Sequence, residues 1–273
     1  MTRSPVLTDI SALASNRARA RQGGPALFLH EDAAAEIEER LNEVNRSFTE
    51  PAVVTAFPAP WAEILPQARF VPDADVLDLA PAAHDLVIHA LALHWANDPV
   101  GQLVQCRRAL RPDGLMIAVL LGGQTLAELR AVLAEAETRL TGGLSPRVLP
   151  MGEIRDLGGL LQRAGFALPV ADAAARPVSY RGLPHLIADL RAMGETNALA
   201  ARRRTPAPRA LFDTAAQLYA ENFPAAGDRV TATFELIYLT GWAPHESQRK
   251  PLRPGSATHS LAAALAAIPP RKD

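Results

Sequence analysis

The sequence predicts an α/β protein with a mostly parallel sheet, and three observations carry this prediction. Strand-like runs alternate with helix-like segments along much of the chain. The runs at 85–91 and 115–121 are almost continuously apolar, as in parallel strands that are buried on both faces. Turn residues separate these runs from segments with helix start signals. Because crossovers between parallel strands are right-handed, this order predicts a sheet with helices on both faces.

The individual elements follow from their periodicity, taken in chain order. Predicted strands cover 52–57, 85–91, 115–121 and 229–242, with short strands at 168–170 and 176–180. Predicted helices cover 31–46, 60–65, 126–140, 153–164, 184–193 and 210–223, with another beginning at Pro99. Asp98 is an N-cap before Pro99, and the spacing of Thr125 and Glu128 predicts a capping box. The alternation in 229–242 predicts a long edge strand.

Composition excludes several classes of protein. The 273 residues carry 28 basic and 29 acidic side chains, so the chain lacks the basic excess that is typical of nucleic-acid binders. Cys106 is the only cysteine, which rules out an internal disulfide or a multi-cysteine metal site and favours a reducing, cytoplasmic location. No apolar run approaches the roughly 20 residues that span a bilayer, and residues 1–8 lack the apolar core of a signal peptide.

The chain is predicted to form one main domain. Residues 1–24 form an N-terminal arm that ends at Gly23-Gly24, with a basic helix that is either solvated or laid on a partner. Residues 25–260 form the domain, in which 181–225 is a helical insertion, and residues 261–273 form a tail. The sequence shows no internal repeat and no sign of a second core.

Two polar stretches follow neighbouring strands at the carboxyl edge of the predicted sheet, where ligands of open α/β sheets bind. One contains His94 and Trp95, and the other contains Gly122 and Thr125. Both precede helix N-termini, whose free N–H groups suit an anionic or polar ligand. His94 could act as a general base, and Trp95 could stack on a planar ring. The alternative is that both stretches are well-capped turns, with Trp95 packing as a loop anchor.

Other residues give weaker indications. Asp75 and Asp78 could bind ribose hydroxyls, although acidic residues are common near turns. His89 lies within a strand and is predicted to be a core residue with a hydrogen-bond partner. The polar cluster at 242–248 is either a functional surface or a capped loop. No Gly-x-Ser-x-Gly elbow and no metal-ligand spacing is present, so the sequence assigns no catalytic residue and no metal.

Several motifs resemble the class I S-adenosylmethionine-dependent methyltransferases. They lie at 91–98, 110–114, 122–130, 142–146, 156–158, 193–197, 241–248 and 255–258. The first two resemble the malonyl-carrier-protein methyltransferases of biotin synthesis, and the others resemble the complex I assembly-factor group of the same superfamily. The resemblance implies a Rossmann-like methyltransferase fold with an antiparallel last strand. It also implies S-adenosylmethionine as cofactor and a protein as substrate or partner. The cofactor-binding residues it implies are Asp75, Asp78, His94, Trp95, Gly122 and Thr125.

The first loop departs from that family. The family's first strand ends in an acidic residue and a Gly-x-Gly loop, which lets the backbone approach the methionine part of the cofactor. Residues 54–61 instead contain Phe57, Trp61 and two prolines, and residues 25–100 contain no glycine. Two readings follow. The chain is either a methyltransferase or hydroxylase that holds the cofactor through an unusual loop, or a non-catalytic binding or assembly module on the same fold.

Overall fold

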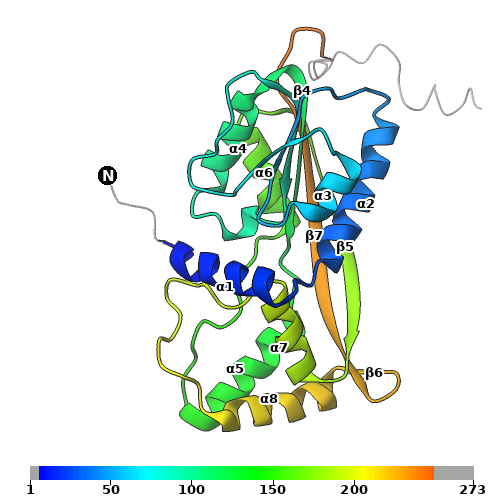
Figure 1. Cartoon of the computed structure of the whole chain (residues 1–273). Coiled ribbons are helices and arrows are strands. Elements are labelled where there is room, and N and C mark those ends of the chain that lie inside the picture. The colour runs from blue at the N-terminus through cyan, green and yellow to red at the C-terminus, as the bar shows by residue number, and fades with distance from the viewer. Residues whose placement is uncertain (1–5, 249–273) are drawn as a thin grey trace, which may run out of the picture.

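The computed structural model describes residues 6–248, which contain one mixed sheet (Figure 1). The strands are β1 (Pro51–Val54), β2 (Arg69–Val71), β3 (His84–Ala90), β4 (Leu110–Leu121), β5 (Ala167–Tyr180), β6 (Pro224–Ala225) and β7 (Arg229–Trp242). Their order is β2-β1-β3-β4-β7-β5, and β6 pairs with β7. β1 to β4 are parallel, whereas β7 runs antiparallel to β4 and β5. The predicted α/β fold with an antiparallel last strand is confirmed.

Helices cover both faces and the carboxyl edge of this sheet. They are α1 (Ile10–Gly23), α2 (Phe28–Glu43), α3 (Ala59–Ile64), α4 (Pro99–Ala109), α5 (Ala127–Thr141), α6 (Ile154–Arg163), α7 (Leu183–Ala192) and α8 (Arg209–Asn222), with a short 3₁₀ turn η1 (Leu93–Trp95). One face packs on α2 and α3 through Ile37 and Trp61, and the other packs on α4 and α6 through Leu103 and Leu161. α5, α7 and α8 gather below the strand ends, and α1 crosses above them (Figure 1).

The sequence misplaced two strands of the sheet. The segment predicted as an edge strand, β7, lies between β4 and β5, which explains why Phe234 and Leu236 are fully buried. The edge belongs to β5, which is one strand of 14 residues instead of two short ones. Its alternating exposure, with Val170 and Leu168 partly in solvent, obscured its length in the sequence.

Helix caps gave one confirmation and one correction. Asp98 caps α4 as predicted, because its carboxylate accepts a hydrogen bond from Gly101 N at 2.8 Å. The capping box at Thr125 and Glu128 is wrong, since both side chains bond to β7 instead. Thr125 Oγ1 accepts from Glu235 N at 3.0 Å, and the Glu128 carboxylate accepts from the backbone N–H of β7 at 3.2 Å. These two residues therefore fix the start of α5 to the last strand.

The N-terminal helix α1 is partly buried, so the prediction of a solvated basic helix is wrong. Asp9 caps it by accepting a hydrogen bond from the Ala12 N–H at 3.1 Å. Arg17 and Asn16 are buried at 5% and 8% exposure, together with the apolar Leu13. The helix packs on α7 and lies along the carboxyl edge of the sheet. One side of this basic helix is thus buried, whereas Arg19 and Arg21 on its other side stay exposed.

Some predictions fall outside the described residues. The motif at 255–258 and the tail at 261–273 are among them. Within residues 6–248, no helix combines the length and hydrophobicity needed to cross a bilayer. The same residues contain no group of acidic, histidine or cysteine side chains that could hold a metal ion.

Candidate functional site

The loop after β1 is filled by aromatic side chains. Phe57 and Trp61 are 4% and 0% exposed; Phe57 lies in the loop after β1, and Trp61 lies in α3, which follows that loop. Trp61 Nε1 donates a hydrogen bond to His30 Nδ1 at 3.1 Å, and the Phe57 ring packs edge-on against the same imidazole. Burial lowers the pKa of His30 to about 4, so at neutral pH this imidazole is uncharged and can accept the indole proton. The side chains of Phe57 and Trp61 therefore occupy the space that a glycine loop would leave free for a cofactor.

A buried ion pair closes the end of β2. Arg17 Nη1 lies 2.6 and 2.9 Å from the two carboxylate oxygens of Asp73, just beyond the strand. The two side chains are 6% and 12% exposed. In dinucleotide-binding α/β folds, an acidic residue of this kind binds the ribose. Here the carboxylate is already neutralised by α1. Sequence reasoning missed Asp73 because β2 is only three residues long and gave no strand signal.

Asp75 and Asp78 lie farther along the same segment, on the surface. Asp78 pairs with Arg69 at 2.5 Å, and its side chain is 83% exposed. The backbone oxygen of Asp75 accepts a hydrogen bond from Gln105 on α4 at 2.9 Å. The partners of these two residues thus lie on β2 and α4. The structure does not bring them to the side chains that surround His94.

His94 and Trp95 converge on a single carboxylate. Glu195 Oε2 accepts a hydrogen bond from Trp95 Nε1 at 2.6 Å and lies 3.1 Å from His94 Nε2. Burial raises the pKa of Glu195, but the charge and hydrogen bond of His94, with help from Arg17 and Trp95, outweigh that effect and lower the pKa. Glu195 is therefore ionised at neutral pH. His94 and Trp95 were predicted as site residues from the sequence, whereas Glu195 was included only within the motif at 193–197.

Gly194 explains how Glu195 reaches this place. It ends α7 with a φ of +77°, a conformation that favours glycine. A Cβ at this position would also lie 3.0 Å from Arg17 Cγ and 3.4 Å from the Phe57 ring. The glycine therefore lets the turn after α7 pack tightly against α1 and the aromatic loop, and it directs the next side chain toward Trp95.

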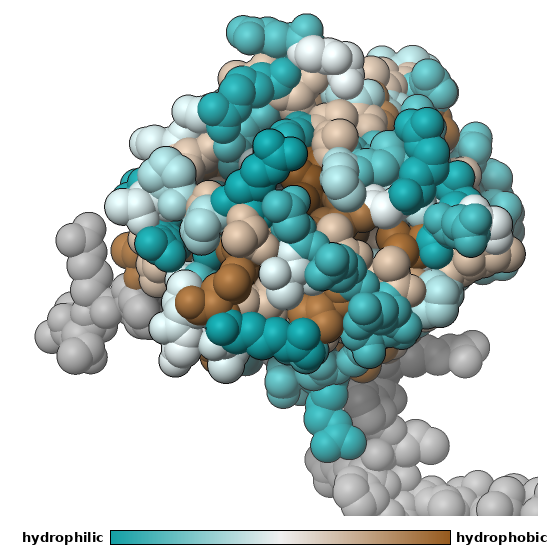
Figure 2. Space-filling view, turned by 90° about the horizontal axis from the view of Figure 1, so that it is seen from below, coloured by the Kyte–Doolittle hydropathy of each residue, from teal (hydrophilic) through white to brown (hydrophobic). Residues whose placement is uncertain are grey.

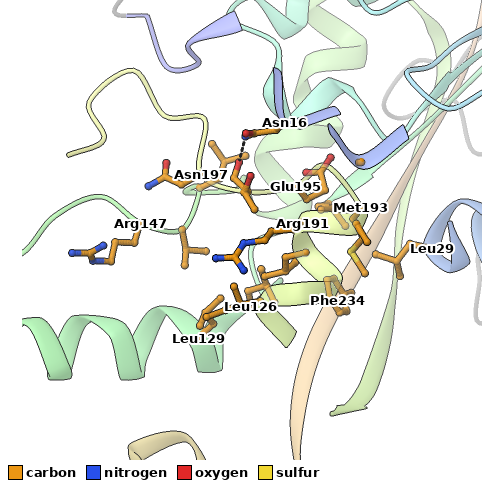
Figure 3. Close-up of a pocket in the computed structure, with 18 of the residues that line it drawn as sticks. Asn16, Leu29, Leu126, Leu129, Arg147, Arg191, Met193, Glu195, Asn197 and Phe234 are labelled. Atoms are coloured by element: carbon orange, nitrogen blue, oxygen red, sulfur yellow. Dashed lines mark hydrogen bonds between the residues drawn. The ribbon is translucent and has the colours of Figure 1, made fainter. Parts of the chain in front are cut away.

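A large cavity opens beside this carboxylate, between α1, α5 and α7 and the end of β4. Its volume is about 800 Å³. Most of the lining is apolar, with Leu126 and Leu129 on one side and Met193 and Phe234 on another (Figure 3). The polar lining consists of Asn16, Arg19, Arg147, Arg191, Glu195, Thr196 and Asn197. Figure 2, which views this lower end, shows apolar surface in hollows between hydrophilic side chains.

Gly122 and Thr125 are not among the residues that line this cavity. Thr125 Oγ1 is bonded to the backbone of Glu235, as described above. A Cβ on Gly122 would overlap the Glu235 carboxylate and the Ile237 side chain. Their neighbours Leu121 and Leu126 line the cavity instead. The predicted ligand role of these two residues stays a prediction.

The remaining candidates support the fold. His89 is fully buried, and its Nε2 lies 2.6 Å from Gln102 Oε1, so its prediction as a core residue is confirmed. Within the 242–248 cluster, Trp242 pairs with the amino-terminal half of β4, and Gln248 donates to the Asp113 carboxylate at 2.8 Å. This cluster therefore lies at one end of β4, and the cavity lies at the other end, beside Leu121.

Comparisons with known proteins agree with the fold. Residues 59–118 match the family model described as "Methyltransferase domain". The chain is 38% identical over 198 residues to the zebrafish arginine-hydroxylase NDUFAF5, mitochondrial, which covers 72% of this chain and 61% of the relative. It is 35% identical over 179 residues to the malonyl-[acyl-carrier protein] O-methyltransferase of Xylella fastidiosa, and the matched region covers 66% of this chain and 58% of the relative. The YcgJ protein of Bacillus subtilis shares the fold, with a TM-score of 0.50 at 10% identity over 79% of this chain and all of that one.

The chain has the Rossmann-like fold of the class I S-adenosylmethionine-dependent methyltransferases, and its sequence is similar to members of that superfamily. Within that superfamily, the chain resembles both the NDUFAF5 arginine-hydroxylases and the malonyl-carrier-protein methyltransferases. It spans 61% and 58% of the length of the two relatives named above.

Proposed function

We propose that this chain is a methyltransferase-fold binding protein that takes an arginine-bearing segment of a protein partner into the cavity between α1, α5 and α7. The observation that carries the proposal is the position of Glu195. It is an ionised carboxylate in the wall of a large apolar cavity. Beside it, the place expected for a cofactor is occupied by the chain's own side chains. The proposal is one of binding and assigns no reaction.

The residues at the ends of β1 and β2 do not fit S-adenosylmethionine in the pose that the family resemblance implies. Phe57 and Trp61 occupy the space after β1, and Arg17 occupies the carboxylate of Asp73. Admitting the cofactor there would break the Trp61–His30 hydrogen bond and the buried ion pair. Breaking a buried ion pair alone typically costs about 3–5 kcal/mol. The proposed function therefore does not involve the methyl donor.

The charges around Glu195 favour a cationic ligand. Glu195 Oε2 lies 3.1 Å from His94 Nε2, whereas His30 is neutral and Arg17 forms its ion pair with Asp73. Glu195 Oε2 takes both described hydrogen bonds, whereas Oε1 accepts none from residues 6–248. Oε1 can therefore accept further hydrogen bonds, and a guanidinium supplies several donors in a planar fork that matches a carboxylate. The apolar walls would surround the methylene chain of an arginine.

The names of the relatives support an arginine ligand and a protein partner. The zebrafish and human relatives are named arginine-hydroxylases. From the resemblance to a complex I assembly factor, we propose a subunit of a respiratory complex as the partner and the cytoplasm as the location. The competing candidate is an active methyltransferase that holds the cofactor through a rearranged loop. The match of residues 59–118 to a methyltransferase domain favours that candidate.

Calorimetric titration with two peptides tests the proposal. Both are nine residues long, with serines around a central residue that is arginine in one and neutral citrulline in the other. We expect the arginine peptide to bind about tenfold or more tightly, because a hydrogen bond to a charged group contributes about 1.5–3 kcal/mol. Equal binding of the two peptides, or no binding of either, contradicts the proposal.

A matched pair of variants locates the effect. Glu195→Gln keeps the size of the side chain and removes its charge, so the preference for arginine over citrulline should disappear. Glu63→Gln makes the same change on the exposed side of α3 and should leave the preference intact. Circular dichroism of each variant verifies that it is folded. A preference that survives Glu195→Gln would place the arginine elsewhere.

A further inference from the structure

Two arginines at the mouth of the same cavity form no ion pair with an acidic side chain of residues 6–248. Arg19 comes from α1 and Arg191 from α7, and both are exposed. Arg19 Nη2 donates to Asn16 Oδ1 at 2.6 Å, and Arg191 makes no side-chain hydrogen bond or ion pair with residues 6–248. Figure 3 shows the Arg191 guanidinium reaching into the space between Asn197 and Leu126. Their free charge is directed toward whatever enters the cavity.

The third arginine of the lining differs from these two. Arg147 binds the carboxylate of Glu137 through two contacts of 2.6 and 3.1 Å, and the Glu137 side chain is only 3% exposed. Hydrogen bonds from Arg147 and Ser145 lower the pKa of the Glu137 carboxyl group to about 2. Both members of the pair are therefore charged, and the pair has no net charge. Arg147 therefore shapes the wall and adds little charge. The net positive charge of the mouth comes from Arg19 and Arg191.

The cavity thus presents two signs of charge at different depths. Glu195 provides negative charge in the buried wall, and Arg19 and Arg191 provide positive charge at the exposed rim. A ligand that carried only positive charge would be repelled at the rim. A ligand that carried only negative charge would meet Glu195. The complementary ligand is a cation that reaches inward with anions beside it at the surface.

We infer that the partner segment carries acidic residues two positions before and after its arginine, and that Arg19 and Arg191 bind them. This inference rests on the proposed function, since it presupposes the arginine at Glu195. In an extended segment, successive side chains point to opposite sides and alternate side chains share one side. An arginine can then enter the cavity while the side chains two positions before and after it, on the same side of the segment, meet the rim. Arg19 and Arg191 act as specificity-determining residues at that rim.

The inference is tested with three peptides of nine residues that share the central arginine. The residues two positions before and after the arginine are aspartates in the first peptide, serines in the second and lysines in the third. Exposed ion pairs each change affinity by about two- to fivefold, so two of them predict about tenfold tighter binding of the aspartate peptide over the serine peptide at low salt. The lysine peptide should bind more weakly than both. The differences in affinity among the three peptides should become smaller as the salt concentration is raised.

Variants assign the effect to the rim. In Arg19→Gln/Arg191→Gln, the three peptides should bind with nearly equal affinity, while arginine is still preferred over citrulline. Arg108→Gln, an exposed arginine on α4 outside the cavity lining, removes one charge and should keep the ranking of the peptides.

The possible results distinguish a failure of this inference from a failure of the proposed function. If arginine is preferred over citrulline but the flanks make no difference, the inference about acidic neighbours is overturned and the proposed function stands. If the ranking of flanks survives in the double variant, other residues read the flanks and the inference is also overturned. If the chain binds the arginine peptide and the citrulline peptide with equal affinity, the proposed function itself fails.

Discussion

Arg17 and Asp73 form a buried ion pair that joins the N-terminal helix to the end of β2, with Arg17 Nη1 2.6 and 2.9 Å from the two carboxylate oxygens. Arg17 Nε and Nη2 have no hydrogen-bond partner within residues 6–248. The pair neutralises Asp73 and packs α1 against the site. It is therefore the contact that most clearly separates this chain from a protein with an open ribose site.

Removing one partner of this pair should destabilise the fold strongly. Arg17→Met leaves the Asp73 carboxylate nearly buried and unpaired, which typically costs about 3–5 kcal/mol in the free energy of unfolding. Urea denaturation followed by circular dichroism measures the loss. The double variant Arg17→Met/Asp73→Asn should recover part of it, because no unpaired charge is left. A single variant as stable as the parent chain would mean that the pair contributes nothing.

Stability should fall as the pH falls below neutrality, because of His30. Its pKa is lowered from 6.5 in the unfolded chain to about 4 in the folded chain, mainly by burial. Between these values the unfolded state binds a proton that the folded state does not, so the stability present above pH 6.5 is lost toward pH 4. At about 1.4 kcal/mol per pKa unit, the loss approaches about 3 kcal/mol.

The matched variants for this pH effect are His30→Gln and His245→Gln. Gln at position 30 offers an oxygen to Trp61 Nε1 and does not titrate, so the dependence of unfolding free energy on pH should flatten. His245 is exposed on the opposite edge of the sheet, and its replacement should leave the slope between pH 4 and pH 6.5 unchanged. An unchanged slope in His30→Gln would show that another group causes the effect.

Gly122→Ala should destabilise the junction between β4 and α5. The added Cβ would overlap the Glu235 carboxylate and the buried Ile237 side chain. Overpacking of this kind costs about 1–3 kcal/mol. Gly143→Ala is the matched control, since nothing lies within 4 Å of a Cβ placed there. Thermal unfolding of the two variants measures the difference, and equal melting temperatures would contradict the packing described at Gly122.

The sequence predicted the sheet well where its signals were local. The continuous apolar runs gave β3 and most of β4, and Asp98-Pro99 gave the start of α4. The position of β7 could not be read in the same way, because alternation shows which face a strand buries and says nothing of which strands flank it. Thr125 and Glu128 had the spacing of a capping box, yet tertiary hydrogen bonds to β7 determined their role.

The candidate site was predicted only in part. His94 and Trp95 were found because they follow a clear strand. Their partner Glu195 lies 100 and 101 positions farther along the chain, so no local pattern could connect them. Arg17 looked like one of several solvated arginines, because only the packing of α1 shows that it is buried. The absence of glycine in residues 25–100 did point to a filled first loop, and Phe57 and Trp61 fill it.

The most direct test of the account is equilibrium titration of the purified chain with S-adenosylmethionine and S-adenosylhomocysteine, with the melting temperature recorded at the same ligand concentrations. Because Phe57, Trp61 and the Arg17–Asp73 pair occupy the expected site, we predict no saturable heat and no rise in melting temperature up to millimolar ligand. A micromolar dissociation constant would instead stabilise the fold by about 4 kcal/mol at a thousandfold excess of ligand over that constant. That result would contradict the central claim and favour an active methyltransferase.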